Sequence, residues 1–200
     1  MKITIVYDNQ ADEGLKSGWG FSCLIETEEK ILFDTGDSGE NLIYNFRQLN
    51  IQPESIAAVV LSHNHWDHTG GLKEFSKLNN NARVFRPKSF SKPTEISPGV
   101  HSTGALGKLI KEQSLVVNTE RGNIVITGCA HPGLAKIIDK ATELGKIHGV
   151  LGGFHDFSKL EKLRSIKLIA PCHCTQQTQQ IRQSYPAEFK EIRAGRIIEI

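Results

Sequence analysis

Apolar residues recur along this chain at two different spacings, which predict where strands and helices lie. Short apolar runs rich in β-branched residues are typical of buried strands, and they occupy residues 2–7, 19–26, 30–34, 57–61, 114–119, 123–127, 148–153, 166–171 and 195–200. Apolar positions at helical spacing predict helices over residues 40–49, 71–78, 133–144, 158–164 and 175–183. Residues 86–104, rich in Pro, Ser, Gly and Lys, follow neither spacing. We expect them to form one long irregular segment, a candidate lid.

The order of these elements predicts the fold class. In each half of the chain, strands that can pair as antiparallel neighbours come first, and strands that alternate with helices follow. This pattern, present twice, indicates an α/β protein of two sheets packed face to face with helices outside. No repeat or linker divides the chain, so we expect a single domain over residues 1–200.

Composition excludes several classes of protein. The chain has 38% hydrophobic and 23% charged residues, as soluble globular proteins do. Its longest apolar runs, such as IAAVVL at 56–61, are too short to span a bilayer. A net charge of +2 gives no reason to expect binding to nucleic acid or to a membrane. We therefore expect a small-molecule partner, while the oligomeric state is left open.

The N-terminus and the cysteines indicate the compartment. The first residues, MKITIVYD, are typical of a strand rather than of a signal peptide. We therefore expect reduced thiols and a cytoplasmic location. Cys23 is expected to be a small buried residue. The other three cysteines flank candidate ligands and stay open between burial and metal binding: Cys129, Cys172 and Cys174.

The stretch SHNHWDHTGG, residues 62–71, gathers ligand-type side chains. It follows the predicted strand at 57–61, and alternation along an extended chain directs His63, His65 and Asp67 to the same side. His68 lies where the chain turns, since Thr69 and two glycines precede the next predicted helix. Imidazole and carboxylate groups are common metal ligands, and packing gives no reason to place so many imidazoles together. The stretch therefore predicts a metal site.

Three more histidines follow predicted strands in the second half of the chain. They are His131, His155 and His173, which come after the strands at 123–127, 148–153 and 166–171. Open α/β sheets place their sites at the carboxyl ends of strands. We therefore expect His131 and His173 to be metal ligands, and His155 stays open between a ligand and an ordinary polar residue.

These motifs resemble those of the metallo-β-lactamase superfamily. SHNHWDHTGG is similar to its H-x-H-x-D-H signature, ILFDTG (31–36) to its first motif, TGCAHPG (127–133) to its third and APCHCT (170–175) to its last histidine motif. GWGFSCLIE, PGVHSTG, EQSL, TGCAHPGL and GGFH resemble stretches of one branch more closely. That branch comprises the proteins similar to dihydropterin-ribofuranosylaminobenzene phosphate synthase. The resemblance implies an αββα sandwich fold.

The same resemblance implies a ligand set and a reaction. His63, His65 and His131 would hold one metal, and Asp67, His68 and His173 would hold a second. Zn²⁺ is expected at both positions, and Fe or Mn would also suit such ligands. A metal-bound hydroxide would attack an ester, lactone, thioester or phosphoester, with Asp67 orienting it. The alternatives are a transferase similar to the synthase of that branch and a metal-binding module without catalysis.

The fourth motif differs from the usual family pattern, which has a bridging aspartate there. This chain has GGFHD, so either His155 or Asp156 takes that place. The GGFH of the branch favours His155, which is also a candidate catalytic residue.

A few further residues are candidates for supporting roles. Asp34 is expected either to accept a histidine N–H or to cap the turn that follows it. Trp19 and Trp66 would either stack on a flat ring or pack at the rim of the site. The segment 86–104 offers four possible contacts for phosphate or carboxylate, or an ordinary solvated basic loop: Lys88, Lys92, Ser102 and Thr103.

Overall fold

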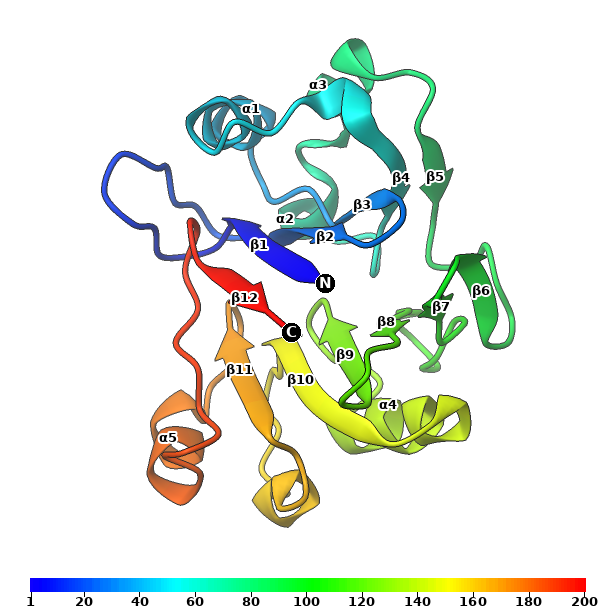
Figure 1. Ribbon diagram of the computed structural model, residues 1–200, viewed down its shortest axis with the longest axis vertical. Coiled ribbons are helices and arrows are strands. Elements are labelled where there is room, and N and C mark those ends of the chain that lie inside the picture. Colours follow the sequence, from blue (N-terminus) through cyan, green and yellow to red (C-terminus); the bar gives the residue numbers. More distant parts are fainter. The chain divides into compact units, whose positions relative to one another are not determined.

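The computed structural model describes residues 1–200 and divides into two compact units (Figure 1). The first unit comprises residues 1–86 and 192–200, and the second comprises residues 87–191. Each unit is built on one six-stranded sheet. None of the helices has the length and apolar character of a membrane span. The expectation of a single domain stays a prediction.

The sheet of the first unit is mixed, in the order β12-β1-β2-β3-β4-β5. Antiparallel pairing joins β12 to β1, β1 to β2 and β2 to β3, whereas β3, β4 and β5 run parallel. The strands are β1 (Lys2–Tyr7), β2 (Ser22–Glu26), β3 (Lys30–Phe33), β4 (Ile56–Val60), β5 (Arg83–Phe85) and β12 (Ile197–Glu199). The helices are α1 (Gly39–Gln48), α2 (Trp66–Thr69), α3 (Leu72–Leu78) and a 3₁₀ helix, Pro53–Ser55.

Helix α1 shows how the sequence builds the core of this unit. It begins after Ser38, whose hydroxyl accepts the N–H of Asn41 at 3.3 Å, a typical N-cap. Its buried face carries Leu42 and Phe46. Phe46 meets Phe75 of α3 edge to face, with ring centroids 6.3 Å apart. Both rings are fully buried, so the pair anchors α1 and α3 in one apolar cluster.

The sheet of the second unit is also mixed, in the order β11-β10-β9-β8-β7-β6. Here β9, β10 and β11 run parallel, and the remaining neighbours pair antiparallel. The strands are β6 (Thr94–Ser97), β7 (Val100–Ser102), β8 (Leu115–Val117), β9 (Asn123–Thr127), β10 (Ile147–Gly153) and β11 (Leu168–Cys172). The helices are α4 (Leu134–Ala141), α5 (Thr178–Ser184) and two 3₁₀ helices, Thr142–Leu144 and Leu160–Leu163.

Helix α4 covers part of this second sheet. Its buried face carries Leu134, Ile137 and Ile138, which lie in one apolar cluster with Val125 and Val150 of the sheet. The predicted helix at 133–144 is thus confirmed as α4 plus a 3₁₀ turn. The 3₁₀ turn ends at Gly145, whose φ of +133° is one that residues with a Cβ rarely adopt.

The segment 86–104 corrects one prediction. It is not irregular throughout, because β6 and β7 lie within it and form an antiparallel hairpin. Their residues alternate polar and apolar over only a few positions, too briefly for a clear signal from the sequence. Pairing of β7 with β8 adds the hairpin to the sheet. The remaining predicted strands and helices are found near their expected positions.

Candidate metal centre

The ligand-rich stretch of the first unit lies beyond the carboxyl end of β4, as the sequence predicts. His63 comes three residues after the end of the strand, and His65 is the N-cap of α2, a single helical turn that carries Asp67 and His68. The glycines after it are required by close packing. A Cβ at Gly70 would lie 2.2 Å from the carbonyl oxygen of Asp37, which no other residue could tolerate.

The tight turn brings the predicted ligands of the first unit together. The rings of His63 and His65 have centroids 4.5 Å apart, and those of His63 and His68 are 4.2 Å apart. His68 Nε2 lies 3.8 Å from Oδ2 of Asp67. His63, Asp67 and His68 are buried, whereas His65 is exposed.

Asp34, at the carboxyl end of β3, holds residues of this cluster through hydrogen bonds. Its Oδ2 lies 2.7 Å from Nδ1 of His68, and its Oδ1 accepts the N–H of Ser62 at 2.6 Å. The Ser62 hydroxyl donates to Oδ2 of Asp34 at 2.7 Å and lies 2.9 Å from Nδ1 of His63. A carboxylate can only accept, so Nδ1 of His68 carries a proton, and in the neutral imidazole Nε2 then carries the lone pair.

The donor atoms of this cluster fit a metal ion. Zinc bonds to imidazole nitrogen and carboxylate oxygen are about 2.0–2.2 Å long, so one ion can bridge the 3.8 Å between Asp67 and His68. The tautomer imposed by Asp34 presents the lone pair that such a bond needs. Imidazoles and a carboxylate therefore form a candidate ligand group on chemical as well as geometric grounds.

The second unit carries its candidate donors on loops that follow three neighbouring parallel strands. Cys129 and His131 follow β9, His155 follows β10, and His173 follows β11. Two of these residues have left-handed backbones, with φ of +49° at His155 and +52° at His173. Such angles are uncommon for residues with a Cβ and are enriched at functional sites.

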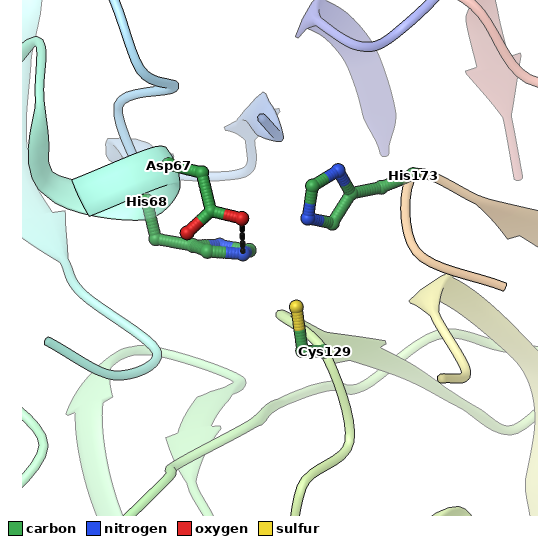
Figure 2. A group of neighbouring side chains, drawn as sticks. All are labelled: Asp67, His68, Cys129 and His173. Carbon is green, nitrogen blue, oxygen red and sulfur yellow. Dashed lines mark ion pairs between the residues drawn. The ribbon is translucent and has the colours of Figure 1, made fainter. Parts of the chain in front are cut away.

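Side chains from different loops of the second unit lie close together in pairs. The rings of His131 and His155 have centroids 5.0 Å apart. The Cys129 thiol and a ring nitrogen of His173 lie within 4.8 Å of one another. Figure 2 shows Cys129 and His173 on their loops, and Asp67 and His68 on α2 with their ion pair dashed.

The two candidates for the fourth motif differ in exposure. The His155 side chain is 39% exposed, whereas that of Asp156 is 81% exposed. Nδ1 of His155 lies 3.5 Å from Oδ1 of Asp156. His155 also has the ring of His131 beside it, so it is the residue of the pair that faces other candidate ligands.

The candidate substrate contacts divide into exposed and buried groups. Trp19 and Trp66 are 53% and 62% exposed, and Lys88 and Lys92 are also exposed. Ser102 and Thr103 are buried and bonded inside the second unit. The Ser102 hydroxyl donates to Oε1 of Gln113 at 2.7 Å, and the Thr103 hydroxyl accepts the N–H of Ser114 at 3.0 Å. These bonds give both hydroxyls a structural role.

Two buried residues near the candidate ligands were missed from the sequence. Ser62 stands at the start of SHNHWDHTGG and bonds both Asp34 and His63, but a lone serine carries no signal. Glu112, in the EQSL stretch, accepts main-chain N–H groups from the loop that holds His131. Only the resemblance of EQSL to a family stretch pointed to that region.

The chain is similar to known proteins in sequence. Residues 20–95 match the family model of the metallo-β-lactamase superfamily. The chain is 27% identical to 7,8-dihydropterin-6-methyl-4-(β-D-ribofuranosyl)aminobenzene-5′-phosphate synthase of Methanocaldococcus jannaschii, over 90% of this chain and 89% of that protein.

Solved structures are similar over the whole length. The crystal structure of Tm1679, a metal-dependent hydrolase of the β-lactamase superfamily, matches with a TM-score of 0.84 and 26% identity, covering 100% of this chain and 99% of that one. Zn²⁺-bound PqqB of Methylobacterium extorquens matches in fold alone, with a TM-score of 0.64 and 11% identity over 100% of both chains. The fold class is therefore the α/β sandwich of metallo-β-lactamase type expected from the motifs, and the chain is similar to proteins of that superfamily.

Proposed function

We propose that this protein is a metal-dependent hydrolase that binds two metal ions, with Zn²⁺ favoured and Fe or Mn compatible. His63, His65 and His131 would bind one ion, and Asp67, His68 and His173 would bind the other. The observation that carries the proposal is the buried contact of Asp34 with His68, which prepares Nε2 of that imidazole as a ligand. Fold similarity to Tm1679 supports the same class of reaction.

The metals would supply Lewis acidity and lower the pKa of water to about 7, which suits attack on an ester, lactone, thioester or phosphoester. Asp67 would orient the attacking water through its carboxylate, since its Oδ2 lies at the ligand cluster. His155 would contact the substrate or complete the second metal site, because it is partly exposed beside His131. A small molecule in the cytoplasm is the proposed partner.

Metal content tests the proposal directly. Protein purified without added metal should contain metal, or should take up Zn²⁺, Mn²⁺ or Fe²⁺ when these are supplied. A matched pair of variants locates the site: His63→Ala should lose metal, whereas His148→Ala, on β10, should retain it. Less than about half a metal per chain, together with no uptake of added metal, would contradict the proposal.

A transferase is the second candidate, favoured by the identity to the synthase along most of both chains. The product in that name joins a dihydropterin methyl group to an aminobenzene ribofuranosyl phosphate. A transferase of this kind should turn over a reduced pterin pyrophosphate only when the aminobenzene substrate is also present. Absence of that product, beside plain hydrolysis of an ester, would reject this candidate.

A metal-binding module without catalysis is the third candidate. It shares the ligand cluster but predicts no turnover. A panel of esters, lactones, thioesters and phosphodiesters, assayed with metal-loaded protein, separates it from the hydrolase. Failure of the whole panel and of the transferase assay would favour the module.

A further inference from the structure

The loop at 128–133, between β9 and α4, holds two candidate donors outside regular secondary structure. Cys129 and His131 lie on this loop, and Ala130 between them has a φ of +59°. A left-handed backbone is rare for a residue that carries a Cβ, because the Cβ crowds the neighbouring carbonyl. Interactions from outside the loop must therefore favour this conformation.

Glu112, a residue that is only 1% exposed, provides such interactions through its carboxylate. Its Oε1 accepts the N–H of Cys129 at 3.1 Å and that of Ala130 at 2.8 Å. Its Oε2 accepts the N–H of His131 at 2.8 Å. Three successive N–H groups that converge on one anion form a nest, and bonds to an ionised acceptor are stronger than neutral ones.

The chain segment around Glu112 is in turn held by hydrogen bonds. The main chain of Glu112 pairs with that of Leu106 in both directions, at 3.0 and 2.8 Å. The next residue, Gln113, is fixed by the Ser102 hydroxyl at 2.7 Å. The Glu112 carboxylate therefore extends from a hydrogen-bonded segment and binds three consecutive N–H groups of the loop.

We infer that Glu112 is a positioning residue that aims the His131 imidazole and the Cys129 thiol through the main chain of their loop. The inference rests on the proposed function, because it assumes that His131 binds a metal. A glutamate with a merely structural role would change stability when replaced. A positioning glutamate would also change metal affinity and the geometry of the ligands.

Two variants with a matched control test this role. Glu112→Gln keeps the shape but presents an amide NH₂ to N–H donors, so the affinity for Zn²⁺ should fall about 10–100-fold, as outer-sphere changes do. The visible absorption of the Co²⁺-loaded variant should shift, since the ligand geometry changes. Glu112→Asp keeps the charge and should retain part of the affinity. The control is Glu95→Gln, because the Glu95 carboxylate also accepts a main-chain N–H, that of Gly99 at 2.9 Å.

The outcomes separate this inference from the proposed function. Wild-type protein that binds no metal would overturn the proposed function. Wild-type protein that binds Zn²⁺, with Glu112→Gln matching it in affinity and in Co²⁺ spectrum, would overturn only the role of Glu112. If Glu112→Gln fails to fold, an NMR measurement on the wild-type protein still tests the inference. Scalar couplings across the hydrogen bonds, from the amide nitrogens of Ala130 and His131 to Cδ of Glu112, should be detectable by NMR, and their absence would overturn the inference.

Discussion

Oδ2 of Asp34 lies 2.7 Å from Nδ1 of His68, and both side chains are completely buried. The two residues are brought together by the parallel pairing of β3 with β4, whose carboxyl ends lie side by side. Hydrogen bonding to the second ring nitrogen fixes both the tautomer and the orientation of a metal-binding histidine.

Asp34→Asn should weaken metal binding by about 10–100-fold, because an amide no longer stabilises the proton on Nδ1 of His68 as a carboxylate does. Competition with a chromogenic zinc chelator measures the change. Asp139→Asn is the control, since the carboxylate of Asp139 forms an exposed ion pair with Lys162 at 3.2 Å. Equal zinc affinity in Asp34→Asn and wild-type protein would contradict the role of Asp34.

Ser62→Ala should lower the free energy of unfolding by about 1–3 kcal/mol, because Asp34 and His63 lose a buried hydrogen-bond partner. Urea denaturation gives the value. Ser55→Ala removes an exposed hydroxyl that bonds the Gln52 carbonyl at 2.7 Å, and should change stability by less than about 0.5 kcal/mol. Indistinguishable losses in the two variants would argue against the buried network.

His65→Ala and His155→Ala should separate a primary ligand from a residue closer to the substrate. His65→Ala should abolish turnover and lower the bound metal, because it removes an imidazole from the cluster with His63. His155→Ala should cut turnover while the first metal stays in place. Elemental analysis and activity assays on both proteins are sufficient, with His148→Ala as control. Full metal content and activity in His65→Ala would refute the assignment of residues 63–68.

Chelation should destabilise the protein, since a ligand that binds only the folded state stabilises it by mass action. Saturation at about 100 times the Kd corresponds to about 2.7 kcal/mol. We expect the thermal midpoint to fall after treatment with a chelator and to return when Zn²⁺ is added. A thermal midpoint that changes with neither treatment would mean that metal binding is not coupled to folding.

Cys23 should be unreactive in the folded protein. Burial, and secondly the charge of Asp34, raise the pKa of its thiol well above the usual value. Because the folded state favours the protonated thiol, this contribution to stability is present below the unfolded pKa of about 8.5 and is lost as the pH rises above it. Stability should therefore fall as the pH rises above about 8.5, and less steeply in Cys23→Ala. Disulfide-forming reagents should label the partly exposed Cys174 before Cys23, and the reverse order would contradict this.

Local pattern was sufficient for much of the fold and for the cluster of candidate ligands in the first unit. Apolar periodicity predicted α1 and α4, because each helix buries one continuous face, and short apolar runs predicted the parallel strands except β5, Arg83–Phe85. The spacing of His63, His65, Asp67 and His68 predicted their convergence, since all four lie on one short strand-to-helix turn. No long-range information was needed for either inference.

The sequence pattern could not predict hydrogen bonds and strand pairings between residues far apart along the chain. The bond from Asp34 to His68 spans 34 positions, and those from Glu112 to its loop span 17 to 19, so no periodicity encodes them. The hairpin of β6 and β7 was missed because its pairing with β8, rather than its own composition, makes it a strand pair. The left-handed backbone at Ala130 likewise has a contact outside its loop, because its N–H bonds to Glu112. Local chemistry selects the donors, and long-range packing orients them, because ligand direction depends on backbone angles that neighbouring residues in the chain do not set.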